Sequence, residues 1–144
     1  AEAGEEKEKD PDFLKGRRIM LVEDNELNRE IAYELLSESG LIVDVAENGQ
    51  DAIKLLGTRP ENYYELIFMD IQMPVMNGYE ATANIRAGKS DYWKNIPVIA
   101  MTANVFQEDE SRAAECGMSD YVTKPIDMNV IYSVLEKWLR GQKG

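Results

Sequence analysis

Short runs rich in apolar residues alternate along the chain with longer stretches of mixed character. Five runs predict strands, at residues 19–22, 41–46, 66–69, 98–101 and 121–123. The first, third and fourth runs lack polar alternation, which is typical of strands that are covered on both faces. They are therefore expected to form the centre of a sheet.

Between these runs, apolar residues recur at spacings of three and four, which predicts amphipathic helices. The helices are expected around residues 27–36, 52–56, 78–86, 108–116 and 131–139, while the segment after Ser90 with Tyr92 and Trp93 is expected to be a loop. Trp138 shares a helix face with Ile131 and Leu135, so we expect it in the core. Five strand and helix pairs in strict alternation predict an α/β fold, a doubly wound parallel sheet with helices on both faces.

The two ends of the chain differ from this alternating region. Residues 1–16 carry six acids and three lysines, with Phe13 and Leu14 as the large apolar side chains. Such a segment buries too little apolar surface to offset its ordering entropy, so we expect a flexible acidic linker. The predicted organisation is a linker at 1–16, one domain at 17–140 and a short tail at 141–144.

Composition excludes several classes of function. The 144 residues suit one domain, and 16 basic against 27 acidic residues give a net charge of −11. Nucleic-acid binding is disfavoured, because it depends on cationic neutralisation of phosphates. The absence of histidine rules out a Ser-His-Asp triad and histidine metal sites in this chain. No run approaches the ~20 apolar residues of a membrane span, so no membrane contact is expected.

Polar residues follow the predicted strands where each strand ends. Glu23 and Asp24 follow the first strand, Asp70 the third, Thr102 the fourth and Lys124 the fifth. Ligands of an open parallel sheet bind outside the carboxyl ends of its strands, so these side chains are aimed at one edge. Two carboxylates ~6 Å apart repel by on the order of 3 kcal/mol at an effective dielectric of ~20. We therefore expect a lysine, a raised pKa or a bound cation to compensate them.

Oxygen ligands of this kind suit Mg²⁺, which keeps part of its coordination for water or phosphate. A carboxylate beside Mg²⁺, a lysine and a hydroxyl is suited to phosphoryl transfer onto an aspartate. Asp70 would then be the nucleophile, Lys124 would neutralise the transferring oxygens, and Thr102 would donate a hydrogen bond to one of them.

At these positions the sequence resembles the receiver domain of two-component response regulators. The resemblance rests on residues 22–25 (VEDN), 69–78 (MDIQMPVMNG), 100–104 (AMTAN) and 121–125 (YVTKP). It implies a flavodoxin-like (βα)5 fold with strand order 2-1-3-4-5. It also implies that Asp70 accepts a phosphoryl group from a histidine of a partner, either a histidine kinase or a histidine-containing phosphotransfer domain.

The resemblance assigns roles to further residues of the site. Mg²⁺ would be bound by Glu23, Asp24, Asp70 and the backbone carbonyl of Gln72. Lys124 would contact the phosphate and precede a cis peptide bond. The acidic pair is Glu-Asp, where many members of the family have Asp-Asp.

The resemblance also implies a conformational switch, in which Thr102 and Tyr121 would respond to phosphorylation. By itself, the domain would catalyse only its own phosphorylation and dephosphorylation.

The residues of these motifs are most similar to those of receiver domains attached to hybrid sensor histidine kinases. The acidic linker and the absence of an initial Met agree with a domain from the C-terminal end of such a chain. We expect a cytoplasmic setting for this domain, and a membrane-anchored parent chain is compatible with it. A free-standing single-domain regulator is the alternative. An aspartyl-phosphate phosphohydrolase is less favoured, because Gln72 stands where those enzymes have a second acid. An interaction module that has lost phosphorylation has little support, because the acidic residues, the hydroxyl and the lysine are all present.

Overall fold

The chain folds around one parallel five-stranded sheet. The computed structural model describes residues 12–73, 75–88, 90–103 and 107–140. The strands lie in the order β2-β1-β3-β4-β5, which confirms the predicted flavodoxin-like topology. Their bounds are β1 Arg18–Val22, β2 Ile42–Ala46, β3 Leu66–Asp70, β4 Val98–Thr102 and β5 Asp120–Thr123.

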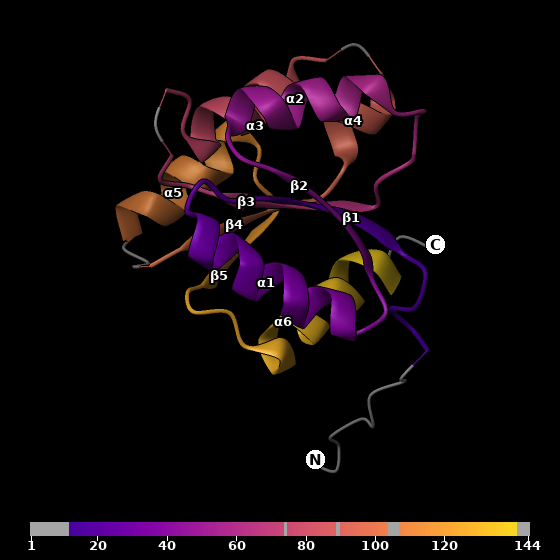
Figure 1. Cartoon of the computed structure of the whole chain (residues 1–144). Coiled ribbons are helices and arrows are strands. Elements are labelled where there is room, and N and C mark those ends of the chain that lie inside the picture. The colour runs from indigo at the N-terminus through magenta and orange to yellow at the C-terminus, as the bar shows by residue number, and fades with distance from the viewer. Residues whose placement is uncertain (1–11, 74, 89, 104–106, 141–144) are drawn as a thin grey trace, which may run out of the picture.

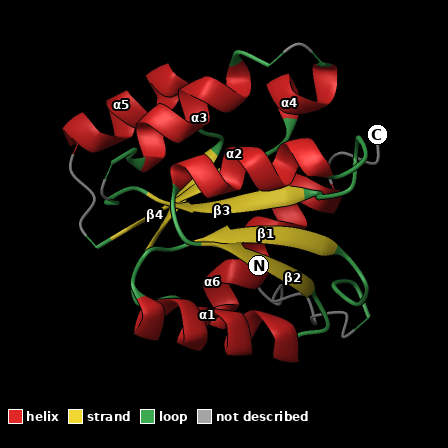
Figure 2. Cartoon of the chain, turned by 45° about the horizontal axis from the view of Figure 1, so that its top comes forward, coloured by secondary structure: helices red, strands yellow, loops and turns green. Residues whose placement is uncertain are grey.

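Helices cover both faces of the sheet (Figure 1). Their bounds are α1 Glu26–Glu38, α2 Gly49–Thr58, α3 Gly78–Arg86, α4 Asp91–Asn95, α5 Gln107–Cys116 and α6 Met128–Leu135, which a π-helical turn continues over Glu136–Arg140. Helices α1 and α6 lie on one face, and α2, α3, α4 and α5 lie on the other, as Figure 2 also shows. None of the helices within the described ranges combines the length and apolarity needed to cross a bilayer.

The three central strands are buried on both faces, as their continuous apolar runs predicted. Residues 19–22, 66–69 and 98–101 are all at most 2% exposed. Alternate side chains enter two separate cores, because successive residues of a strand point to opposite faces. Met20, Ile67 and Val98 pack beneath α2 to α5, whereas Ile19, Phe68 and Ile99 pack against α1 and α6. This double burial fixes the direction in which each strand end points.

The segment after Ser90 forms a short helix, α4, where a loop was predicted from the sequence. The Ser90 side chain caps it by accepting a hydrogen bond from Trp93 N at 3.2 Å. The Tyr92 hydroxyl accepts from Tyr64 N and donates to Tyr64 O, both at 2.8 Å. These two bonds tie α4 to the loop before β3 and offset the weak intrinsic stability of so short a helix.

The end of α6 departs from a regular helix. Its apolar face is buried as predicted, but Trp138 lies in the π-helical turn and is only partly buried. The indole Nε1 of Trp138 donates to Asp120 Oδ2 at 2.9 Å. Trp138 therefore joins the C-terminal helix to the start of β5 as well as packing beside the core.

Phe13 and Leu14 pack against the domain, although they were predicted to lie in the flexible linker. Both are buried in the core on the α1 and α6 face. The centroids of the Phe13 and Tyr132 rings lie 6.0 Å apart. The backbone carbonyl of Phe13 accepts a hydrogen bond from Arg17 Nε at 2.7 Å. The Arg17 guanidinium also pairs with Glu65 at 2.7 Å. The rest of the predicted linker, up to residue 11, and the predicted tail at 141–144 lie outside the described residues.

We expect Phe13→Ala to lower the free energy of unfolding by about 2–3 kcal/mol, because it removes a buried ring from a formed core. Urea unfolding of the whole chain measures this loss. Val130→Ala is the matched control, since Val130 is exposed on α6, and should change stability by less than about 0.5 kcal/mol. Equal stability of Phe13→Ala and the parent chain would show that the packing of this segment contributes nothing.

Candidate functional site

The five polar residues predicted at the strand ends do meet at one edge of the sheet. Asp70 is the last residue of β3 and Thr102 the last of β4, while Glu23 and Asp24 follow β1 and Lys124 follows β5. The parallel register aligns these ends, because β1 pairs with β3, β3 with β4 and β4 with β5. The position of each polar residue directly after an apolar run was thus sufficient to predict which side chains come together.

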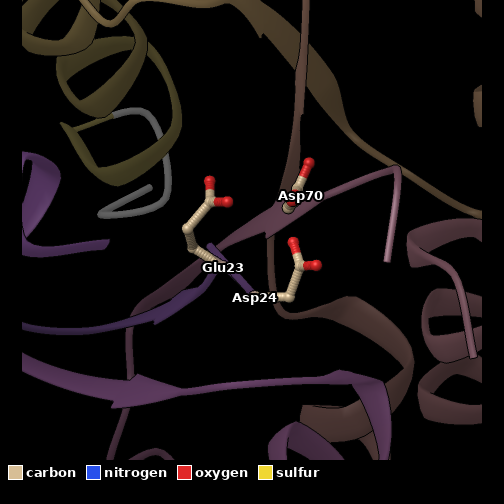
Figure 3. A group of neighbouring side chains, drawn as sticks. All are labelled: Glu23, Asp24 and Asp70. Atoms are coloured by element: carbon tan, nitrogen blue, oxygen red, sulfur yellow. The ribbon is translucent and has the colours of Figure 1, made fainter. Parts of the chain in front are cut away.

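Three carboxylates form the centre of the site. Glu23, Asp24 and Asp70 each offer an oxygen within 4.8 Å of the others (Figure 3). Glu23 is 3% exposed and Asp70 is 2% exposed, whereas Asp24 is open to solvent. The cluster therefore has two buried acids at its base and one acid at its mouth, an all-oxygen donor set of the kind that binds hard divalent cations.

Lys124 bridges the two buried acids. Its Nζ lies 3.0 Å from Asp70 Oδ1 and 3.1 Å from Glu23 Oε1. Burial lowers the pKa of Lys124, but its bonds to Asp70 and Glu23 outweigh burial and leave this pKa raised. The ammonium is thus held in its charged form. One such charge leaves three carboxylates undercompensated, and this is the electrostatic condition for cation binding.

Asp70 titrates far from its ordinary range. Burial, followed by repulsion from Glu23, raises its pKa to about 7, although Lys124 opposes the shift. The backbone N of Gln72 donates to Asp70 Oδ1 at 3.3 Å, and the backbone N of Asn25 donates to Glu23 Oε2 at 3.2 Å. These bonds orient both carboxylates, and a cation placed between them would favour the ionised form of Asp70.

The loop after Asp70 is held by a close backbone approach that was not predicted from the sequence. Gly78 N donates to Ile71 O at 2.9 Å. A Cβ at Gly78 would overlap the carbonyl oxygen of Asp70 and lie 2.9 Å from Ile71 Cα. Asn77 and Glu80 form a capping box that starts α3 at this point. The Asn-Gly-x-Glu pattern signalled a helix start, but not its contact with the end of β3.

The turn between β1 and α1 is also fixed by residues that were not predicted to matter. The Asn25 side chain accepts from Asn28 N at 2.9 Å and caps α1. Arg29 Nη1 donates to the carbonyl of Glu23 at 3.0 Å. These contacts hold the backbone that carries Glu23 and Asp24, so they position two of the three acids.

Thr102 and Tyr121 project from the same face of the sheet. Thr102 pairs in register with Thr123 and Ala100 pairs with Tyr121, so side chains at these positions point to a common side. Thr102 is buried and its carbonyl accepts from Lys124 N at 2.8 Å, whereas Tyr121 is exposed. The peptide bond between Lys124 and Pro125 is cis, as the resemblance implied.

Residues 19–136, which include all five residues of this site, match the family model of the response regulator receiver domain. The chain belongs to this family. It is 35% identical over 143 residues to hybrid signal transduction histidine kinase L of Dictyostelium discoideum, a match that covers 99% of this chain and 8% of that protein. This receiver domain therefore spans only a small part of the length of that relative.

Solved receiver structures share the architecture. The receiver domain of the histidine kinase CKI1 from Arabidopsis thaliana, complexed with Mg²⁺ and BeF3⁻, superposes with a TM-score of 0.78 at 29% identity, covering 91% of this chain and 95% of that one. The co-crystal structure of the Saccharomyces cerevisiae phosphotransfer protein Ypd1 with the receiver domain of Ssk1 gives a TM-score of 0.76 at 29% identity, covering 88% and 90%.

Gly78→Ala is expected to lower the free energy of unfolding by about 2–3 kcal/mol, because the new methyl group must displace the end of β3. Gly57→Ala is the matched control. A Cβ at Gly57, within α2, would only touch the Trp93 ring at 3.9 Å, so helix propensity should raise stability by up to about 1 kcal/mol. Urea unfolding distinguishes the two variants, and similar values for both would refute the close approach.

Asp70→Asn is expected to raise the free energy of unfolding at pH 8 by about 2 kcal/mol in EDTA, since it removes a buried carboxylate. The folded pKa of about 7 exceeds the ordinary value of 3.8. The stabilisation from the protonated carboxyl is thus complete below pH ~4 and is lost as the pH rises through about 7. The gain from Asp70→Asn should therefore shrink towards pH 4. Exposed Glu61→Gln is the control, and a pH-independent gain would contradict the raised pKa.

Proposed function

We propose that Asp70 is the phosphoacceptor of a two-component phosphorelay and takes its phosphoryl group from a phosphohistidine on a partner. The observation that carries this proposal is the buried Asp70 carboxylate, 3.0 Å from the Lys124 ammonium and clustered with two further acids. Membership of the receiver family supports it.

Mg²⁺ is the cation that best suits the acidic cluster. Glu23, Asp24 and Asp70 would hold it, with the backbone carbonyl of Gln72 as a further ligand. The donors are all oxygen, and the similar CKI1 receiver domain was solved with Mg²⁺ and BeF3⁻. When bound, Mg²⁺ would supply the positive charge that three carboxylates and a transferring phosphoryl group require beyond Lys124.

Asp70, Lys124 and Thr102 would have different roles in the phosphoryl transfer. A carboxylate oxygen of Asp70 attacks phosphorus in line, the new P–O bond forms, and the P–N bond to the partner histidine breaks. The electron pair of that bond returns to the imidazole, which takes up a proton and leaves. Lys124 neutralises the transferring oxygens, and the Thr102 hydroxyl donates to one of them.

Phosphorylation would then act on the fourth and fifth strands. The new oxygens at Asp70 recruit Thr102 towards the phosphoryl group, and Tyr121 turns inward on the same face of the sheet. The shared face of the two positions in the β4–β5 register supports this switch. Its output is a shift in the population of surfaces that bind a partner.

The partner that donates the phosphoryl group would dock beside α1. A groove of about 410 Å³ runs between α1 and the loop after β5, and its lining includes Ile31, Met101, Lys124 and Ile126. Ile31, which lines the groove, and Leu27, one helical turn earlier on α1, are large apolar side chains exposed to solvent. A histidine kinase or a histidine phosphotransfer protein would cover this surface. The Ypd1–Ssk1 co-crystal structure is of a histidine phosphotransfer protein with a similar receiver domain.

We further propose that the domain belongs to a hybrid sensor histidine kinase and works in the cytoplasm. The similarity to a Dictyostelium hybrid kinase over nearly the whole chain supports this origin. A free-standing single-domain regulator remains the alternative, and the sequence of the parent chain distinguishes the two.

The decisive experiment is incubation of the chain with Mg²⁺ and acetyl phosphate, followed by intact-mass measurement. We expect one added phosphoryl group on the parent chain and none on Asp70→Asn. Lys124→Gln should slow labelling by about 100-fold, because a charge that stabilises the transferring oxygens is lost. Asp91→Asn is the matched control, since this exposed aspartate starts α4, and should label normally.

Labelling of Asp70→Asn, or no labelling of the parent chain, would overturn the proposed function. Rapid turnover of unrelated phosphate esters would instead identify a phosphohydrolase. Chelation of divalent cations with EDTA should abolish labelling, which tests the cation requirement separately from the identity of the acceptor.

A further inference from the structure

Val75 has a backbone conformation that a valine rarely adopts. Its φ is +69°, in the left-handed region where the Cβ of an L-residue is crowded and a β-branched side chain is most disfavoured. Asn62 also has a positive φ, of +66°, but asparagine tolerates this region. Val75 therefore carries conformational strain that a substitution by asparagine or glycine would relieve.

Burial does not explain the valine. Its side chain is 87% exposed, whereas the other exposed large apolar side chains of the described residues range from 40% to 65%. An apolar group this exposed contributes little to folding. Neither the backbone nor the core of this domain thus favours valine at position 75.

The loop that presents Val75 is anchored on both sides. Met73 is buried in the core, and Met76 packs so closely on Gly49 that a Cβ there would lie 3.0 Å from the Met76 sulfur. Gly78 N donates to Ile71 O where α3 begins. Val75 is therefore a fixed apolar projection five residues beyond Asp70.

The position of this projection complements the surface proposed for the partner. Leu27 and Ile31 are exposed on α1, which covers one face of the sheet. The loop from β3 leads to α3 on the opposite face. Exposed apolar side chains thus flank Asp70 from both faces, and a protein surface that reaches Asp70 would meet both.

We propose that Val75 is a docking residue that inserts its side chain into an apolar depression next to the phosphohistidine of a histidine phosphotransfer protein. This inference rests on the proposed function. Contact with the partner would bury the exposed isopropyl group and so recover, in the complex, the free energy that the strained backbone costs the free domain.

The test compares transfer to the parent chain and to Val75→Asn from two donors, acetyl phosphate and phosphorylated Ypd1. With Val75→Asn we expect kcat/KM for transfer from Ypd1 to fall about tenfold, mainly through KM, while labelling by acetyl phosphate stays unchanged. The melting temperature should rise by about 3–5 °C, because asparagine accepts the left-handed conformation. A rise in stability with a loss of transfer excludes misfolding as the cause.

Two further variants make the outcome specific. Val75→Leu keeps an apolar projection and should retain transfer from Ypd1 within about threefold. Ile42→Asn is the control, because Ile42 is also exposed but starts β2 at the end of the sheet opposite to Asp70, and it should transfer normally.

Equal transfer from Ypd1 to the parent chain and to Val75→Asn would overturn the docking role while leaving the phosphoacceptor intact. The same holds if Ypd1 transfers nothing to a parent chain that acetyl phosphate labels, since the assigned class of partner would then be wrong. Failure of acetyl phosphate to label any variant would instead indicate that the proposed function itself is wrong.

Discussion

The ammonium of Lys124, held between two buried carboxylates, is the interaction on which the site depends. β1 and β3 are neighbours, so their ends bring Glu23 and Asp70 together with little solvent to screen them. The lysine that compensates them comes from the end of β5, beyond β4. β4 ends at Thr102, and the next residue, Ala103, lines the same groove as Lys124. Burial and the repulsion from Glu23 together outweigh the bond to Lys124, so the pKa of Asp70 stays raised.

Much of the fold and the membership of the site were predictable from the sequence for one physical reason. Strands covered on both faces must be continuously apolar, so the runs at 19–22, 66–69 and 98–101 located the centre of the sheet. Once those strands are parallel, the residue that follows each run lies at a common edge. Asp70 and Lys124, which are 54 positions apart, were placed together by this argument alone.

Other features could not be predicted, because they depend on contacts between segments that are distant in sequence. Neither segment carries a local sequence pattern that indicates the contact. The burial of Phe13 needs the ring of Tyr132 from the last helix, and the short helix α4 needs the backbone of Tyr64. The sequence around Gly78 indicated only the start of a helix, whereas in the structure the carbonyl of Asp70 lies against this glycine. In each case tertiary packing, rather than local propensity, determines the conformation.

The contact between Phe13 and α6 has a consequence for any multidomain protein that contains this domain, because it couples the entering chain to the last helix. The segment that leads into β1 packs against α6, the helix that follows β5, through the rings of Phe13 and Tyr132. A movement of the chain that enters the domain would therefore act on α6 through this contact. The path of the chain before Phe13 is thus coupled to the helix that packs beneath the strands carrying Asp70 and Thr102.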